Sequence, residues 1–318
     1  MRTTNTMNVS GNSTADLREP TDFGDREYPV AMVNVTNACN LECAHCFIYR
    51  DGNPVSARDK MDDETMLHQL RKLRDRHNIR YMYFMGGEPM IRKDLVFEGM
   101  KLFEQCQIVT NGTYGIPSAP GHVVTVSLDG PRTANDAIRG EGVFDKVKEA
   151  IHARDGRDGT DVIVQMVITR QNESGLEAFF EEVAEWPISG VAISLYVPTE
   201  NDVSNLDWPD LRDRDKVVRR LIALKQKYPS LLKANTGALE LMFSDVAPQY
   251  TGERGENCPL VGQTLTLYMG EGGNFEQTFC CYGNNVDCTR CGSYLLFNAV
   301  YQQLEGRSDT PIRLAESG

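Results

Sequence analysis

Short runs of apolar and β-branched residues alternate with amphipathic stretches over the first two hundred residues of the chain. The apolar runs predict six β-strands, over residues 30–36, 80–85, 107–110, 122–128, 161–169 and 190–197. The amphipathic stretches predict helices near residues 62–77, 92–104, 142–154 and 173–185. Near-continuous apolar strands that alternate with helices indicate a parallel sheet covered on both faces. Because six βα units are fewer than the eight of a closed barrel, we expect an α/β fold with a partial (β/α)6 TIM-like barrel.

The remainder of the chain has a different pattern. A helix that ends at Pro229 places Val217, Val218, Leu221 and Leu224 on one face. After about residue 250 helical periodicity disappears until about residue 294, which predicts a small loop-rich C-terminal extension. We therefore divide the chain into four parts, listed by residue number: a flexible N-terminal arm (1–25), the core barrel (26–200), a helical connection (201–250) and the C-terminal extension (251–318).

Charge and hydropathy exclude several classes of protein. The 318 residues include 33 Lys and Arg against 45 Asp and Glu, a formal net charge of −12. Nucleic-acid binding needs clustered basic residues, so we expect no nucleic-acid partner. No apolar run approaches the ~18 residues of a membrane span, and the first residues lack the apolar core of a secretory signal. We therefore expect a cytoplasmic protein without a membrane partner.

The nine cysteines carry the candidate chemistry, because eight of them fall into two groups and only Cys106 stands alone. The first group is Cys39, Cys43 and Cys46, with the spacing C-x3-C-x2-C directly after the first strand. That position is the carboxyl end of the sheet, where ligands bind in such folds. Three thiolates with an open fourth position suit an iron–sulfur cluster, whereas structural zinc usually takes four ligands. A zinc site or three buried thiols remain the alternatives.

A second motif follows the second strand, where Gly86, Gly87, Glu88 and Pro89 read GGEP. Two glycines allow the backbone to approach a ligand closely, and Glu88 offers a carboxylate to an ammonium group. Taken alone the motif is a common turn. Together with the cysteine spacing at the end of the preceding strand it is highly specific.

The segments CNLECAHC and GGEP resemble the radical S-adenosylmethionine (radical SAM) superfamily over roughly residues 29–200. The resemblance implies a 4Fe–4S cluster on Cys39, Cys43 and Cys46, with SAM on the fourth iron and the GGE segment at the methionine amino group. One electron from a flavodoxin- or ferredoxin-type donor would then cleave SAM, and the 5′-deoxyadenosyl radical would abstract hydrogen from a substrate. The family often has an aromatic residue where this chain has His45.

The resemblance also suggests contacts to SAM or substrate at the ends of later strands. The candidate positions are Thr110, Asn111, Gly112, Ser127, Asp129, Gln165, Val167 and Ile168. Arg139 is a candidate partner for the SAM carboxylate, since guanidinium pairs with carboxylate in bidentate fashion. Each of these residues could instead be a turn, a helix cap or part of the core.

The second cysteine group lies in the extension and comprises Cys258, Cys280, Cys281, Cys288 and Cys291. It resembles the shortened "twitch" form of the SPASM extension, in which four cysteines bind an auxiliary 4Fe–4S cluster. The resemblance implies the ligand set Cys258, Cys281, Cys288 and Cys291, and a zinc site is the alternative. Adjacent residues of an extended segment point to opposite sides, so we expect Cys280 to be packed away or turned toward the barrel mouth.

We therefore expect a radical SAM enzyme of natural-product biosynthesis that acts on a small molecule such as a sugar or a nucleoside. Epimerisation or rearrangement, two-electron oxidation and radical addition that forms a C–C bond remain open as outcomes. A ribosomal peptide is an alternative substrate, although we expect no leader-binding domain ahead of residue 30. The alternative outside enzymology is a zinc-stapled interaction protein on a degenerate barrel.

Overall fold

A computed structural model describes residues 20–50, 52–56 and 58–306 of the chain. Most of the arm predicted over residues 1–25, and the end of the extension, lie outside the described residues. Among the described residues, no helix combines the length and the apolar character needed to cross a membrane.

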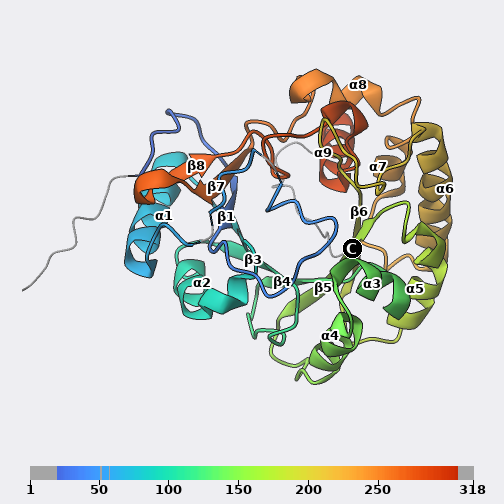
Figure 1. Ribbon diagram of the computed structural model, residues 1–318, viewed down its shortest axis with the longest axis horizontal. Coiled ribbons are helices and arrows are strands. Elements are labelled where there is room, and N and C mark those ends of the chain that lie inside the picture. Colours follow the sequence, from blue (N-terminus) through green and yellow to red (C-terminus); the bar gives the residue numbers. More distant parts are fainter. Residues whose placement is uncertain (1–19, 51, 57, 307–318) are drawn as a thin grey trace, which may run out of the picture.

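One eight-stranded sheet organises the molecule, with the strand order β6-β5-β4-β3-β2-β1-β7-β8 (Figure 1). The strands are β1 (Val30–Asn34), β2 (Tyr81–Met85), β3 (Gln105–Thr110), β4 (Val123–Ser127), β5 (Asp161–Ile168), β6 (Gly190–Leu195), β7 (Thr264–Met269) and β8 (Phe275–Gln277). Neighbouring strands pair in parallel, except that β8 runs antiparallel to β7. The six predicted strands and the open, partial barrel are thereby confirmed.

Helices cover the sheet, and the four predicted helical stretches of the barrel all contain one. The α-helices of the described residues are α1 (Asp63–His77), α2 (Lys93–Met100), α3 (Arg132–Arg139), α4 (Val143–His152), α5 (Leu176–Val183), α6 (Leu211–Lys227), α7 (Thr236–Glu240), α8 (Pro248–Thr251) and α9 (Tyr294–Leu304). Helix α1 begins where the Asp62 side chain accepts a hydrogen bond from the Thr65 N–H, as an N-cap should. Helix α3 was not predicted, because its sequence RTANDAIR offers few apolar positions.

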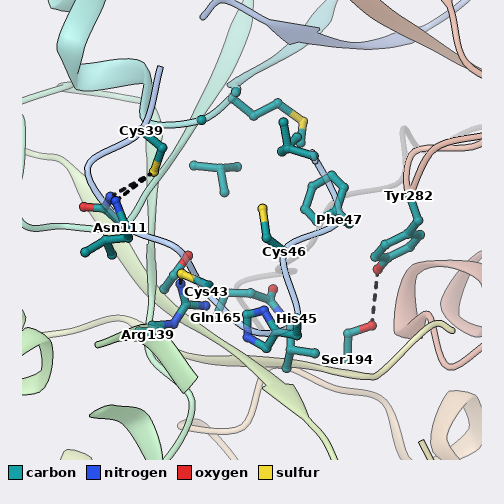
Figure 2. Close-up of a pocket in the computed structure, with 18 of the residues that line it drawn as sticks. Cys39, Cys43, His45, Cys46, Phe47, Asn111, Arg139, Gln165, Ser194 and Tyr282 are labelled. Carbon is teal, nitrogen blue, oxygen red and sulfur yellow. Dashed lines mark hydrogen bonds between the residues drawn. The ribbon is translucent and has the colours of Figure 1, made fainter. Parts of the chain in front are cut away.

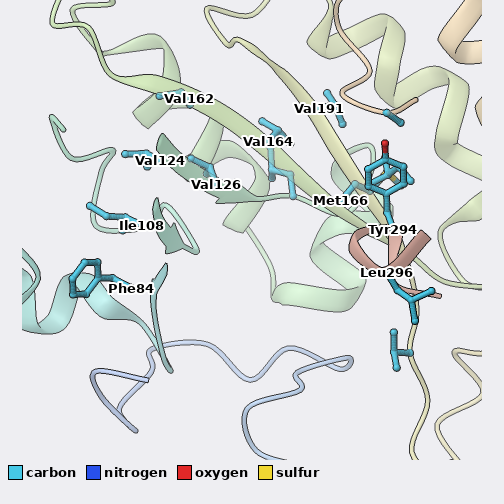
Figure 3. Packing of buried hydrophobic residues seen from close by; sticks show 14 of the residues in the cluster. Phe84, Ile108, Val124, Val126, Val162, Val164, Met166, Val191, Tyr294 and Leu296 are labelled. Atoms are coloured by element: carbon cyan, nitrogen blue, oxygen red, sulfur yellow. The ribbon is translucent and has the colours of Figure 1, made fainter. Parts of the chain in front are cut away.

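Alternate residues of each strand face opposite sides of the sheet. In β1 and β2, Val33 and Phe84 pack with helix residues such as Leu70 in the main core, and Figure 3 shows this layer continuing through the neighbouring strands. The opposite face carries a smaller cluster that includes Tyr81 and Tyr83. Cys106, the isolated cysteine, belongs to the main core.

Strand β7 was also not predicted. Its sequence TLTLYM alternates as a strand should, but it stands in a glycine-rich stretch and its partner β1 lies more than two hundred residues earlier. Pairing with β1 buries Leu265 and Leu267 completely. Part of the predicted C-terminal extension thus belongs to the main sheet.

Candidate functional site

The loop that follows β1 carries Cys39, Cys43 and Cys46, and all three line one cavity at the carboxyl end of the sheet (Figure 2). Hydrogen bonds to Asp59 fix the start of this loop. The Asp59 carboxylate accepts hydrogen bonds from the Thr36 hydroxyl and the Asn37 N–H, each at 2.7 Å. Three thiols that converge on one open cavity fit an iron–sulfur cluster with an iron left for another ligand.

Gly86 and Gly87 line the same cavity because the backbone passes very close to the cysteine loop there. The Gly87 N–H donates to the Thr36 carbonyl at 2.8 Å. Gly86 has a φ of 149°, and a side chain at Gly87 would collide with the Ala38 carbonyl. Only glycine fits these two positions, and the absence of side chains leaves backbone groups accessible to a ligand.

Glu88 and Pro89 are buried beneath the cavity and do not line it. The Glu88 carboxylate accepts three hydrogen bonds, from the Thr110 hydroxyl at 2.7 Å, the Asn111 N–H at 2.7 Å and the Met90 N–H at 3.0 Å. Burial raises the pKa of this carboxyl, and the three donors act against that shift. Glu88 therefore connects the ends of β2 and β3.

Asp129, fully buried after β4, connects the cysteine loop to the barrel. One of its oxygens lies 2.6 Å from the His45 Nε2 and 2.6 Å from the Arg139 Nε. Burial alone would raise the pKa of Asp129, but Arg139 and His45 outweigh it and hold the pKa well below its usual value. His45 thus anchors the cysteine loop to the end of β4.

Arg139 lines the cavity, and its Nη1 lies 3.8 Å from the Cys43 Sγ. Burial raises the pKa of Cys43 to about 11, and the Arg139 charge opposes that shift. The guanidinium therefore favours the thiolate form, which is the form that binds iron.

The remaining predicted positions divide between wall and core. Thr110, Asn111, Ser127, Gln165 and Val167 line the cavity, whereas Gly112 and Ile168 do not. The Asn111 side-chain amide lies 3.9 Å from the Cys39 Sγ and donates to the Asn40 side chain at 2.9 Å.

A wall that the sequence did not indicate comes from the end of β6 and the C-terminal extension. Ser194, Tyr196 and Tyr282 line it together with Arg50. The hydroxyls of Ser194 and Tyr282 lie 3.3 Å apart, and the Tyr282 ring contacts Phe47 edge-on at 5.6 Å between centroids (Figure 2). The only signal in the sequence was the place of Tyr282 directly after two cysteines.

A second cavity contains most of the other cysteine group. Cys258, Cys280, Cys281 and Cys291 line it, and Tyr282 lines both cavities. Cys288 lies on the neighbouring turn η5 (Cys288–Arg290), and burial together with the nearby Cys280 and Cys258 raises its pKa to about 12.

The expectation that Cys280 and Cys281 point apart is wrong. Their sulfurs lie 3.9 Å from each other, because a tight turn joins Cys280 to Gly283 through reciprocal backbone hydrogen bonds. Cys280 therefore lies at the second cavity and does not line the first.

Neither cysteine group is arranged as a preformed single-ion site: within the described ranges, no three His, Cys, Asp or Glu side chains could hold one metal ion. A 4Fe–4S cluster binds each thiolate through a different iron atom. The donor chemistry of both groups, thiols alone, is the one such clusters use.

A model described as "Radical SAM superfamily" matches residues 33–183. The chain is 32% identical over 166 residues to a mycofactocin maturase of Mycolicibacterium smegmatis, covering 48% of this chain and 41% of that protein. It is 30% identical over 174 residues to an Fe-coproporphyrin III synthase of Methanosarcina barkeri, covering 51% of this chain and 43% of that protein. The matched segment thus spans about two fifths of these curated relatives.

Solved structures agree with the fold. The native enzyme anSMEcpe with bound AdoMet superposes with a TM-score of 0.59 at 17% identity, covering 88% of this chain and 84% of that one. SuiB of Streptococcus suis bound to S-adenosylmethionine gives 0.57 at 15% identity, covering 80% and 64%. Residues 33–183, with their three cysteines at the carboxyl end of a partial barrel, are thus the part of the chain that matches the Radical SAM superfamily, a family of enzymes.

Proposed function

We propose that this protein is a radical SAM enzyme that abstracts hydrogen from a small-molecule substrate of natural-product biosynthesis, such as a sugar or a nucleoside. The observation that carries the proposal is the single cavity lined by Cys39, Cys43, Cys46 and the glycines of GGEP. The cluster would be held by these three cysteines. When bound, the cluster and SAM together supply a one-electron reductive cleavage followed by hydrogen abstraction.

The residues around the cavity would orient SAM and exclude water. Gly86 and Gly87 present backbone groups where the chain passes the cysteine loop, and Ser127 and Gln165 add polar side chains from the paired strands β4 and β5. The Arg139 Nε faces Asp129 and its Nη1 faces Cys43. The Nη2 group of the same guanidinium would therefore serve as the donor to the SAM carboxylate.

We further propose an auxiliary 4Fe–4S cluster of the twitch type at the second cavity, on Cys258, Cys281, Cys288 and Cys291. Three of these cysteines line that cavity and the fourth follows on η5. Tyr282 lines both cavities, so its side chain would lie between the two clusters. A flavodoxin- or ferredoxin-type protein of the cytoplasm would supply the electron.

Iron content and SAM cleavage test both proposals. The anaerobically reconstituted protein should hold about eight irons per chain, four for each cluster. Replacing Cys39, Cys43 and Cys46 together by Ala should leave about four irons and abolish release of 5′-deoxyadenosine. The matched control is Cys106→Ala, which changes a core thiol outside both cavities and should keep both properties. Cleavage by the triple variant, or zinc at the second cavity, would contradict the corresponding part.

A further inference from the structure

The Arg50 guanidinium lines the first cavity and retains hydrogen-bonding capacity there. Arg50 lies four residues after Cys46, on the wall that also contains Tyr196 and Tyr282. Its Nη1 is buried and has no hydrogen-bond partner, and within the described part of the chain no carboxylate forms an ion pair with it. A buried N–H without a partner is rare and costly, so this group is prepared for a ligand.

The position of Arg50 is fixed by the fold. The Arg50 Cζ lies 5.3 Å from the centre of the Tyr196 ring, so the ring supports the guanidinium. The loop around Arg50 is closed by Asn53, whose side chain donates to the Phe47 carbonyl at 2.9 Å and accepts from the Asn284 N–H at 2.9 Å. Two segments far apart in the sequence therefore hold this cation at the cavity.

The charges of the cavity are unbalanced. Among its lining residues there is no Asp or Glu, and the other two basic side chains, His45 and Arg139, both contact Asp129. The carboxylate of Asp202 lines a neighbouring cavity and accepts a hydrogen bond from the Ser204 N–H at 2.7 Å; the Arg50 charge helps to lower the pKa of Asp202, but the two side chains form no ion pair. Among the described residues, Arg50 is thus the cation of this cavity that no carboxylate contacts in an ion pair.

We propose that the substrate carries an anionic group, a carboxylate or a phosphate, and that Arg50 binds it. The inference rests on the proposed function, since it assigns the ligand of the same cavity. A planar guanidinium presents parallel N–H groups that match two oxygens of either anion. The Ser194 and Tyr282 side chains, whose hydroxyls lie 3.3 Å apart, line the same cavity and would face the uncharged part of the same molecule.

Equilibrium dialysis of the reconstituted, SAM-loaded protein against radiolabelled inorganic phosphate or acetate tests the proposal at fixed ionic strength. The wild type should bind at least one of the two anions, and the one it prefers distinguishes a phosphate from a carboxylate substrate. Arg50→Gln should weaken that binding by about tenfold to a hundredfold, the loss of one charge-assisted hydrogen-bonded pair. Arg50→Lys, which keeps the charge, should recover part of the affinity.

Arg219→Gln is the matched control, because Arg219 also stacks on an aromatic ring, at 5.4 Å from the Phe243 centre, but does not line the cavity. It should bind the anion as the wild type does. Equal binding by Arg50→Gln, or no binding of either anion by the wild type, would overturn the proposal. So would a matching loss of SAM affinity in Arg50→Gln, because Arg50 would then hold the SAM carboxylate. The proposed function is tested separately, because it fails if the reduced wild type releases no 5′-deoxyadenosine from SAM.

Discussion

Glu88 and Asp129 are fully buried carboxylates that connect strand ends to one another and to the cysteine loop. Glu88 accepts from groups after β2 and at the end of β3, and Asp129 accepts from the Val167 N–H of β5 while pairing with Arg139. Neither side chain lines the first cavity. At this scale the burial of a residue decides its role, because a carboxylate that is satisfied by the protein is not available to a ligand.

Replacing Glu88 tests this role. Glu88→Ala leaves the donors of Thr110, Asn111 and Met90 buried without an acceptor, so the free energy of unfolding should fall by about 2–3 kcal/mol. Urea denaturation measures the change. Glu98→Ala, at an exposed position on α2, should leave stability nearly unchanged. A loss of SAM affinity with unaltered stability would instead identify Glu88 as a direct contact to the SAM ammonium.

Asp129→Asn should destabilise the protein more strongly. The change leaves the buried Arg139 without a charged partner, which costs about 3–5 kcal/mol at neutral pH. Because the folded-state pKa of Asp129 lies below the unfolded value of 3.8, its contribution is complete above pH 3.8 and is lost as the pH falls further. Denaturation curves should therefore show a large difference in the free energy of unfolding between wild type and variant at neutral pH. The difference should shrink as the pH falls into the acid range.

The matched control for Asp129 is Asp213→Asn, which breaks an exposed pair with Lys216 on α6. That pair contributes less than about 1 kcal/mol because water screens it. An equal loss of unfolding free energy in both variants would show that the buried pairs of Asp129 stabilise the protein no more than the exposed pair does.

Helix α6 supports the second cysteine group from outside the barrel. Its buried Arg214 donates to the Arg290 carbonyl at 2.9 Å and to the Cys291 carbonyl at 3.3 Å. The helix thereby fixes the backbone on which Cys288 and Cys291 stand. A helix that lines neither cavity thus fixes the backbone at one of them.

Arg214→Met should therefore impair the second site selectively. The loss of two hydrogen bonds from a charged donor should cost about 1.5–3 kcal/mol, concentrated at the turn η5. Reconstituted iron should fall from about eight toward about four per chain, while SAM cleavage persists. Arg212→Met, on the exposed side of the same helix, serves as the control. Full iron content in Arg214→Met would contradict this support role.

For the whole molecule, the extension after residue 250 contacts both edges of the predicted six-stranded barrel (Figure 1). Strand β7 pairs with β1, and the Leu195 N–H at the end of β6 donates to the Gly292 carbonyl at 2.9 Å. The same extension supplies Tyr282 to the first cavity. Barrel and extension therefore form a common core and a common site.

A chain truncated after Gly252 should consequently lose its cooperative fold. The truncation removes β7 and the buried side chains of Leu265, Leu267 and Phe275. Each such loss costs about 2–5 kcal/mol, and their sum reaches the whole stability of an ordinary domain, about 5–15 kcal/mol. Thermal unfolding followed by circular dichroism measures the effect. A cooperative transition at the temperature of the full chain would mean that residues 1–252 fold independently.

Periodicity and spacing are local properties, so the amino-acid pattern alone was enough to predict the six barrel strands, most of their helices and the first cysteine group. The extension of the sheet by β7, the burial of Glu88 and the place of Cys280 at the second cavity became visible only in the folded chain. The tertiary structure also decided the partners of His45 and Ser194, which are 84 and 88 residues away in the chain. Contacts of that range follow from how strands and helices pack, and no local pattern encodes them.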